Sequence, residues 1–182
     1  NNTVENCGAY DFIFNQGGKN GEGIYIGTAP EQLADGKNPT KDRDVSANNW
    51  IHHNVIKTNA NECVDIKESS RYNLVEHNQC TGQQDSESGG LDSRGDYNVL
   101  RYNDVHDNKG AGIRLGGDED SDGIGNDVYD NKIYNNLGYG IKILRPKQGT
   151  ICGNVLEKNT LGLIGGDFGG DYYPLKTCEI RN

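Results

Sequence analysis

Two basic residues, Lys67 and Arg94, have the types and spacing to act together on an acidic sugar. Their separation is close to the period of an internal repeat, so we expect them on adjacent turns of the chain. β-Elimination at a uronate requires groups that neutralise the substrate carboxylate, remove the C5 proton and protonate the leaving oxygen. We therefore predict Lys67 as the base and Arg94 as the acid or the carboxylate clamp.

Acidic residues accompany both basic residues. Asp65 lies two positions before Lys67, Asp92 lies two positions before Arg94, and Glu62 lies three positions before Asp65. Carboxylate oxygens are the ligands that Ca²⁺ prefers, so we predict a Ca²⁺ site formed by Glu62, Asp65 and Asp92. The alternative is that the aspartates and the basic residues pair as surface ions, which contribute little to stability.

A second candidate for calcium is the acidic stretch from Asp118 to Gly123. Its side chains Asp118, Asp120 and Asp122 follow the DxDxDG pattern of the first half of an EF-hand loop. The second half of the loop pattern is missing, since the twelfth position is Tyr129 instead of Glu. The stretch therefore predicts either an ion that braces a loop or a solvated acidic loop.

The elements that position these residues are predicted by an internal repeat. Its central asparagine recurs 23 to 28 residues apart, as Asn54, Asn78, Asn103, Asn131 and Asn154. Period-two alternation inside short strands, with a longer period near 25, predicts coils stacked about 4.8 Å apart. Stacked amides can donate and accept along their column, so we expect an asparagine ladder. The alternative is that each asparagine only favours a turn.

Apolar columns flank the ladder and predict the core. One column comprises Ile56, Cys80, Val105, Ile133 and Leu156, and the other comprises Ile51, Val75, Leu100, Val128 and Ile151. A second strand in each repeat, often opened by Gly, gives an outward-facing row formed by Tyr25, Asp65, Asp92, Arg114 and Lys142. We predict that Arg114, Lys142 and Tyr25 extend the Lys67 and Arg94 site as substrate-binding residues on an exposed face.

Composition agrees with an all-β solenoid in a single domain covering residues 1–182. The chain has Gly 26, Met 0 and only 32% hydrophobic residues, which disfavours long helices and a compact bundle. The longest break in the period, residues 28–48, predicts a loop that leaves the coil. A net charge of −9 disfavours nucleic acid as a partner, and an acidic polymer would need a local basic patch or a bridging cation. No segment has the length and apolarity of a membrane span.

The cysteines and histidines do not predict a zinc site. The five cysteines lack CxxC spacing, and an odd number leaves at least one thiol unpaired. Cys80 falls on an apolar column and is expected in the core, whereas Cys152 and Cys178 lie near the same corner of successive coils and could form a disulfide. His53 and His77 share one column and predict a stacked surface pair.

These motifs resemble a known family. The segments GEGIYIG (21–27) and ECVDIKESS (62–70), with the Asn-x4-Asn-x-Ile repeat, are similar to right-handed parallel β-helix repeats of the pectate-lyase-like superfamily over most of residues 1–166. A more distant resemblance is to the chondroitinase B and alginate lyase family, in which a Glu five residues before the catalytic Lys helps bind calcium and an Arg lies one coil on. Glu62, Lys67 and Arg94 match those positions, whereas the preceding acidic ligand falls on Ala60.

Two functions follow as expectations. The first is a secreted, carbohydrate-active right-handed parallel β-helix, with coils of about 22 to 28 residues, that binds an acidic polysaccharide and cleaves it as a polysaccharide lyase with Ca²⁺. The second is a non-catalytic extracellular module, structural or adhesive, in a surface assembly. Exposed end coils also predict end-to-end assembly or a longer parent chain.

Overall fold

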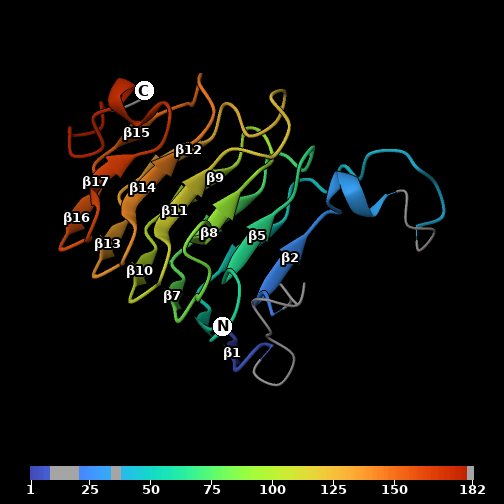
Figure 1. Cartoon of the computed structure of the whole chain (residues 1–182), viewed down its shortest axis with the longest axis horizontal. Helices are drawn as coiled ribbons and strands as arrows, with labels where there is room; N and C mark the ends of the chain where they lie inside the picture. Colours follow the sequence, from blue (N-terminus) through green and yellow to red (C-terminus); the bar gives the residue numbers. More distant parts are fainter. Residues whose placement is uncertain (9–20, 34–37, 180–182) are drawn as a thin grey trace.

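The chain forms a right-handed parallel β-helix, as the repeat predicts. The computed structural model describes residues 1–8, 21–33 and 38–179, and within them all strand pairs of three sheets are parallel. Each full coil contributes one strand to each sheet, so the sheets run side by side along one axis (Figure 1).

The first sheet has six strands and carries one of the predicted apolar columns. Its strands are β1 (Thr3–Glu5), β4 (Val55–Lys57), β7 (Gln79–Thr81), β10 (Asp104–His106), β13 (Lys132–Tyr134) and β16 (Val155–Glu157). The pairings Ile56 with Cys80 and Val105 with Ile133 confirm the column, and these side chains are fully buried.

The second sheet, also six-stranded, carries the candidate site. Its strands are β2 (Ile24–Ile26), β5 (Val64–Ile66), β8 (Gly89–Ser93), β11 (Ala111–Leu115), β14 (Tyr139–Ile143) and β17 (Gly162–Gly165). Ile66, Leu91, Ile113 and Ile141 point inward and are completely buried, so the residues that alternate with them point away from the core.

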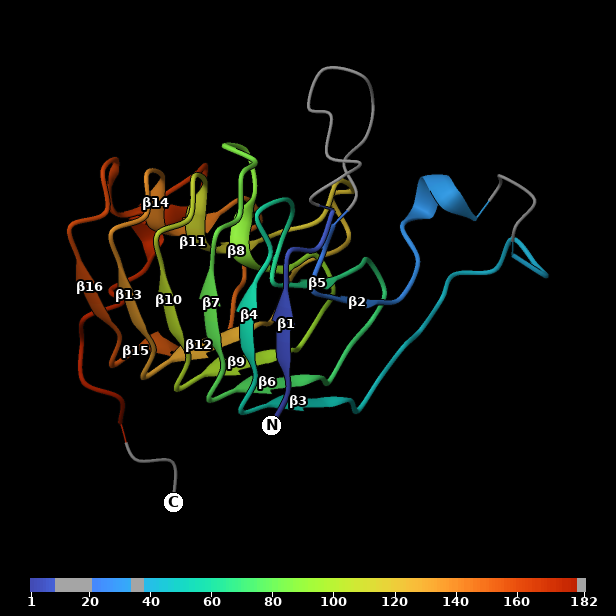
Figure 2. The same cartoon turned by 90° about the horizontal axis from the view of Figure 1, so that it is seen from below.

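The third sheet has five strands and closes the coil (Figure 2). Its strands are β3 (Trp50–His52), β6 (Leu74–Glu76), β9 (Val99–Arg101), β12 (Asp127–Tyr129) and β15 (Ile151–Cys152). The register pairs Ile51 with Val75, Val75 with Leu100 and Leu100 with Val128, which confirms the second apolar column.

The predicted asparagine ladder is present. Asn78 Nδ2 donates to Asn103 Oδ1 at 3.1 Å, and Asn103 Nδ2 donates to Asn131 Oδ1 at 3.0 Å. Two further ladders of the same kind run through Asn49, Asn73, Asn98 and Asn126 and through Asn108, Asn136 and Asn159. Each turn of the coil thus satisfies its buried amides with those of the next coil.

The cysteines confirm two predictions and add an unexpected disulfide. Cys80 lies in the core, as predicted, and is bonded to Cys63. This disulfide joins β7 to the residue that precedes β5, and a comparison of equivalent columns does not reveal it. Cys152 and Cys178 form the expected disulfide, and Cys7 is the free thiol among the described residues.

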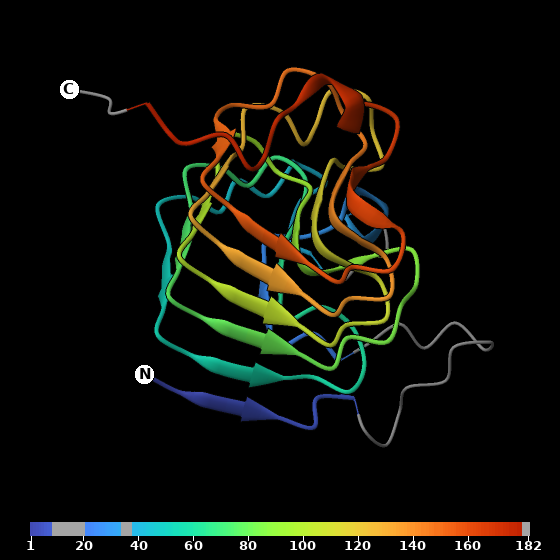
Figure 3. The same cartoon turned by 90° about the vertical axis from the view of Figure 1, so that its left-hand side faces the viewer.

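Two segments lie outside the regular coils: a loop between β2 and β3 and the C-terminal segment. The segment between β2 and β3 leaves the coil and includes a 3₁₀ turn, Pro30–Gln32 (Figure 1). A second 3₁₀ turn, Gly169–Asp171, precedes a C-terminal segment that crosses the end of the stack (Figure 3). That segment is joined to the last coil because Asn154 N donates to Pro174 O at 2.9 Å. Among the residues described, no helix has the length and apolarity needed to span a membrane.

Candidate functional site

The register of the second sheet brings the predicted site residues together. Tyr25 pairs with Asp65, Asp65 with Asp92, Asp92 with Arg114, and Arg114 with Lys142. The next outward column keeps the same register, because Lys67 N donates to Ile26 O and Arg94 N donates to Ile66 O. Lys67 and Arg94 are therefore neighbours on adjacent coils, in the column next to that of Asp65 and Asp92.

The face that carries these residues is covered, in contrast to the exposed strip that the sequence predicts. Asp65 and Asp92 are 0% and 1% exposed, and Lys67 is 7% exposed. One loop contacts the face through Asp118, which binds Arg94, and the pair of Arg43 and Asp122, at 2.8 Å, joins this loop to the segment between β2 and β3. Irregular loops, which have no period in the sequence, thus convert an outward column into a buried ionic cluster.

The cluster is held by short ion pairs. Lys67 Nζ lies 2.7 Å from Asp65 Oδ2, and Arg114 Nη1 donates to Asp92 Oδ2 at 2.7 Å. Arg94 lies between the two aspartates, with Nε 3.4 Å from Asp92 Oδ2 and 3.9 Å from Asp65 Oδ1. Arg94 Nη1 also donates to Asp118 Oδ2 at 2.9 Å. Three bases and three acids therefore balance one another.

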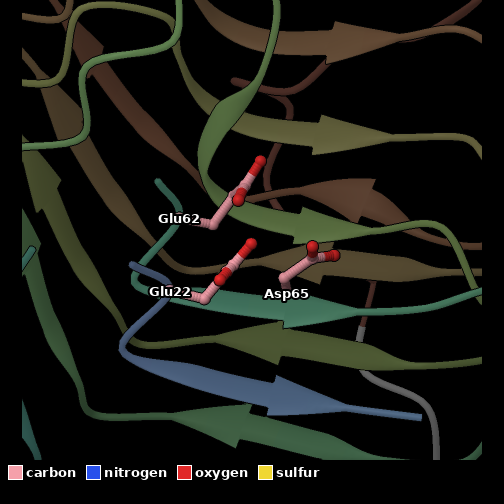
Figure 4. A group of neighbouring side chains, drawn as sticks. All are labelled: Glu22, Glu62 and Asp65. Carbon is pink, nitrogen blue, oxygen red and sulfur yellow. The ribbon is translucent and has the colours of Figure 1, made fainter. Parts of the chain in front are cut away.

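Two further carboxyl groups lie beside this balanced cluster. Glu22, Glu62 and Asp65 each present an oxygen within 4.8 Å of the other two, and the three side chains project to the same side of the sheet (Figure 4). Asn61 Nδ2 donates to Glu22 Oε1 at 3.1 Å, and the Ser88 hydroxyl donates to Glu62. The predicted ligand set was Glu62, Asp65 and Asp92, and in the structure Glu22 takes the place of Asp92.

Burial of this excess negative charge alters several pKa values. Burial, with Asp65 and Asp92 nearby, raises the pKa of Glu62 from 4.5 to about 8, and burial raises that of Asp65 from 3.8 to about 6. Burial opposes ionisation of Asp92, but Arg114 and Arg94 outweigh it and lower its pKa. Burial also opposes the charge on Lys67, yet Asp65 holds the pKa of Lys67 above its usual range.

The three neighbouring carboxylates suit a hard divalent cation. Ca²⁺ takes carboxylate and amide oxygens, and Glu22, Glu62 and Asp65 each present one carboxylate oxygen within 4.8 Å of the other two. A cation there would offset the charge that the three bases of the cluster leave uncompensated. These carboxylates also line a pocket of about 340 Å³ together with Tyr25, Lys67 and Arg94. Cation ligands and basic side chains thus share one opening.

The remaining predicted residues are placed as follows. Tyr25 lies at the pocket, with its ring 4.9 Å from Lys67 Nζ and its hydroxyl donating to Gln32 at 3.1 Å. Arg114 is buried against Asp92 and is not among the residues that line the pocket. Lys142 Nζ donates to the backbone oxygen of Glu87 at 3.0 Å. Neither Arg114 nor Lys142 forms an open binding strip.

The acidic loop does not bring its carboxylates together. Asp118 binds Arg94, Asp120 lies 3.3 Å from Arg145, and Asp122 binds Arg43. Within the described ranges, the group formed by Glu22, Glu62 and Asp65 is the one with three convergent ligands. The geometry therefore favours the ion-paired loop over the predicted calcium loop.

Glu22 was missed by sequence reasoning, although the signal was present. The register that places Tyr25 over Asp65 also places Glu22 over Glu62, and Gly23 N donates to Glu62 O at 2.9 Å. The histidine prediction holds, since the rings of His53 and His77 stack with centroids 4.8 Å apart.

Fold and site together define a parallel β-helix with an ionic, carboxylate-rich pocket on one sheet. The chain belongs to the NosD family, whose model, described as "Periplasmic copper-binding protein (NosD)", matches residues 1–163. Its fold is similar to that of an alginate lyase from Paenibacillus sp. str. FPU-7, with a TM-score of 0.58 and 16% identity. That similarity covers 88% of this chain and 55% of the lyase chain, so this chain spans about half of the lyase. No curated protein matches.

The described residues do not fit copper, which the family description names. Copper favours imidazole, thiolate and thioether donors, and this chain has no Met and four of its five cysteines in disulfides. His52 Nδ1 and His53 Nδ1 lie 3.0 Å apart and the ring of His77 stacks on that of His53, but the group of described residues whose three ligand atoms converge is entirely carboxylate. The disulfides and the family's periplasmic description are consistent with a location outside the cytoplasm.

Proposed function

We propose that the chain is a secreted β-helix protein that binds an acidic polysaccharide at the Lys67 and Arg94 pocket and cleaves it by β-elimination. The observation that carries the proposal is the convergence of three cation-binding carboxylates, Glu22, Glu62 and Asp65, with two basic side chains in one pocket. The net charge of −9 would otherwise repel such a polymer. Glu22, Glu62 and Asp65 would hold a Ca²⁺ ion, which when bound would supply positive charge that neutralises a substrate carboxylate and so favours loss of the C5 proton.

The chain's own residues would supply the other steps. Lys67 would remove the C5 proton, and Arg94 would clamp the carboxylate or protonate the leaving oxygen. Tyr25, whose ring lies over Lys67, would contact the sugar ring at the mouth of the pocket. Arg94 is suited to the clamp because its planar guanidinium binds carboxylates through two parallel hydrogen bonds.

One requirement must be met before Lys67 can act as a base. The 2.7 Å contact with Asp65 keeps its ammonium protonated, because the pKa of Lys67 is held above its usual range. Substrate and cation binding would therefore have to draw Asp65 away from Lys67. The test must consequently include the cation, since without it the pocket holds Lys67 in the wrong protonation state for proton abstraction.

The experiment is a lyase assay on the full chain. Alginate, pectate and glycosaminoglycans are incubated with the protein in Ca²⁺ or in EDTA, and the absorbance of the unsaturated product is followed. The proposal expects product with one polymer in Ca²⁺, and loss of activity by at least a hundredfold in Lys67→Ala. Lys142→Ala is the matched control, because Lys142 binds a loop carbonyl and lies outside the pocket. Unchanged product formation in Lys67→Ala would remove the catalytic assignment.

The second candidate function is a non-catalytic extracellular module, structural or adhesive. It is favoured by one observation: every basic side chain of the cluster is already paired with a carboxylate in the interior of the protein. In that case the ions lock adjacent coils and the covering loops together. Absence of product with every polymer, combined with a stability loss in Lys67→Ala, would support this function over the lyase.

A further inference from the structure

The outward face of the third sheet carries an exposed indole ring, on a different sheet from the ionic pocket (Figure 2). In β3, Ile51 points inward and is buried, so Trp50 and His52 point away from the core. Trp50 is 61% exposed, and the His52 ring stacks on it with centroids 3.9 Å apart. One face of the indole is thus covered by His52, and most of the remaining side chain is open to solvent.

Hydrogen bonds hold this indole in one orientation. Trp50 Nε1 donates to Glu76 Oε1 at 2.8 Å, and Arg101 Nε donates to the other oxygen, Glu76 Oε2, at 2.7 Å. Arg101 also lies over the rings of Tyr102 and Tyr129, so those two rings are already covered. Trp50 is therefore an exposed ring whose orientation is set before any ligand binds, which lowers the entropic cost of binding.

Further rings occupy corner positions of positive φ on both borders of this sheet. They are Tyr72 and Tyr97 before the sheet, and His53, His77 and Tyr102 after it. Ring centroids are 5.8 Å apart between the first two, 4.8 Å apart between the histidines, and 5.1 Å apart between His77 and Tyr102. Each border thus carries a row of rings that runs along the axis of the solenoid.

The corner after the first sheet provides a comparison within the molecule. Four positions there are matched by register and also have positive φ, and they hold Gly82, Asp107, Asn135 and Lys158, all without a ring. Gly, Asn and Asp suit this left-handed region, whereas a tyrosine is disfavoured in it. The borders of the third sheet therefore carry rings that the backbone does not require, and side chains kept at such positions point to a function.

The charges beside these rings are paired within the protein. Glu76 binds Arg101, and Arg71, which lies over the Tyr72 ring, is paired in register with Asp96 on the next coil. Such a face offers rings for stacking and attracts an uncharged ligand in preference to a charged one. Successive coils are about 4.8 Å apart, a repeat comparable with the length of one unit in an extended polysaccharide.

We propose that the outward face of the third sheet binds an uncharged, extended β-linked polysaccharide. One sugar ring would stack on the open side of Trp50, and the polymer would run along the solenoid axis between the two rows of rings. Tyrosine hydroxyls and histidine nitrogens at the borders would bond to sugar hydroxyls. The site uses none of the residues of the Lys67 pocket, so it is independent of the proposed lyase activity.

Trp50 is the one tryptophan in the sequence, so its fluorescence reports on this face alone. The full chain is titrated with cellohexaose and with mannohexaose, in EDTA and at pH 8, where histidine side chains are ordinarily uncharged. Maltohexaose is the α-linked, coiled control, and a galacturonate hexamer is the charged control. We expect at least one β-linked hexamer to protect Trp50 from acrylamide quenching and to bind at least tenfold more tightly than either control.

Three results would overturn the proposal. They are no protection by either β-linked hexamer, equal binding of a control hexamer, and protection that rises with protein concentration in the absence of sugar. The last result would assign the face to contact with a second copy of the chain.

Variants are compared by calorimetry, which needs no fluorescent reporter. Trp50→Ala should weaken binding at least tenfold, and Tyr72→Asn should weaken it at least fivefold with little change in melting temperature, because Asn suits positive φ. Tyr173→Ala is the matched control, since Tyr173 is 74% exposed and lies in the C-terminal segment, at the opposite end of the stack from β3. Unchanged affinity in folded Trp50→Ala would refute the proposal.

Discussion

Replacing Asn103 with Ala would test whether the asparagine ladder stabilises the coil stack. Asn103 Oδ1 accepts from the backbone N and the Nδ2 of Asn78, at 3.0 and 3.1 Å. Asn103 Nδ2 donates to Val75 O at 2.9 Å and to Asn131 Oδ1 at 3.0 Å. All four hydrogen bonds are lost in the variant, and their partners stay buried. At about 1 kcal/mol for each bond, we expect the free energy of unfolding to fall by about 4 kcal/mol.

The assay is urea unfolding followed by far-ultraviolet circular dichroism, with Asn2→Ala as the matched control. Asn2 occupies the exposed end of the same ladder, where its Nδ2 donates to Asn54 Oδ1 at 3.1 Å. Water can replace that bond, so we expect this variant to lose less than about 0.5 kcal/mol. A loss below about 1 kcal/mol in Asn103→Ala, or equal losses in both variants, would show that the amides only fit the turns.

Three further predictions concern the site and the coil contacts. In EDTA, stability should fall as the pH rises from 5 to 8, because the folded protein retains the protons of Glu62 and Asp65, whose pKa values are about 8 and about 6, longer than the unfolded chain does. Glu62 alone contributes about 3 kcal/mol of this loss, so Glu62→Gln should reduce the dependence in urea titrations and leave the smaller part due to Asp65. Removing the Cys63–Cys80 disulfide, which closes a loop with a sequence separation of 17, should cost about 3 kcal/mol, measured with and without reductant. Gly95→Ala should lower stability by about 2 kcal/mol or more in thermal unfolding, since a Cβ would overlap the backbone oxygen of Ser70.

Much of the fold could be predicted because sequence period and spatial register coincide in a parallel solenoid. Once Asn54, Asn78 and Asn103 are aligned in sequence, the residues between them fall into columns that the strand pairings confirm. The Cys63–Cys80 disulfide escaped this reasoning, because it joins two positions that are not equivalent in the repeat. Contacts between different sheets depend on how the coil turns its corners, which the period does not encode.

For the candidate site, the sequence predicted which residues are neighbours but not how deeply they are buried. The adjacency of Asp65, Asp92, Lys67 and Arg94 follows from register alone, and the same register would have identified Glu22. Their burial could not be predicted, because the loops that cover them have no repeat. The prediction of exposed ion pairs and of an open basic strip was therefore wrong, even though the pairing of the strands was right.

Stability and chemistry place separate demands on the ionic pocket, and the two can be measured separately. Three bases balance Asp65, Asp92 and Asp118, so Glu22 and Glu62 are the groups that a cation would hold ionised, although burial keeps the pKa of Glu62 at about 8 without one. A cation that only offsets this charge would raise the melting temperature and remove the pH dependence without any turnover. A catalytic cation must in addition free Lys67 from Asp65, because Lys67 cannot accept a proton while that pair persists. Stabilisation by Ca²⁺ without lyase activity would therefore support the structural module, and only the two effects together would support catalysis.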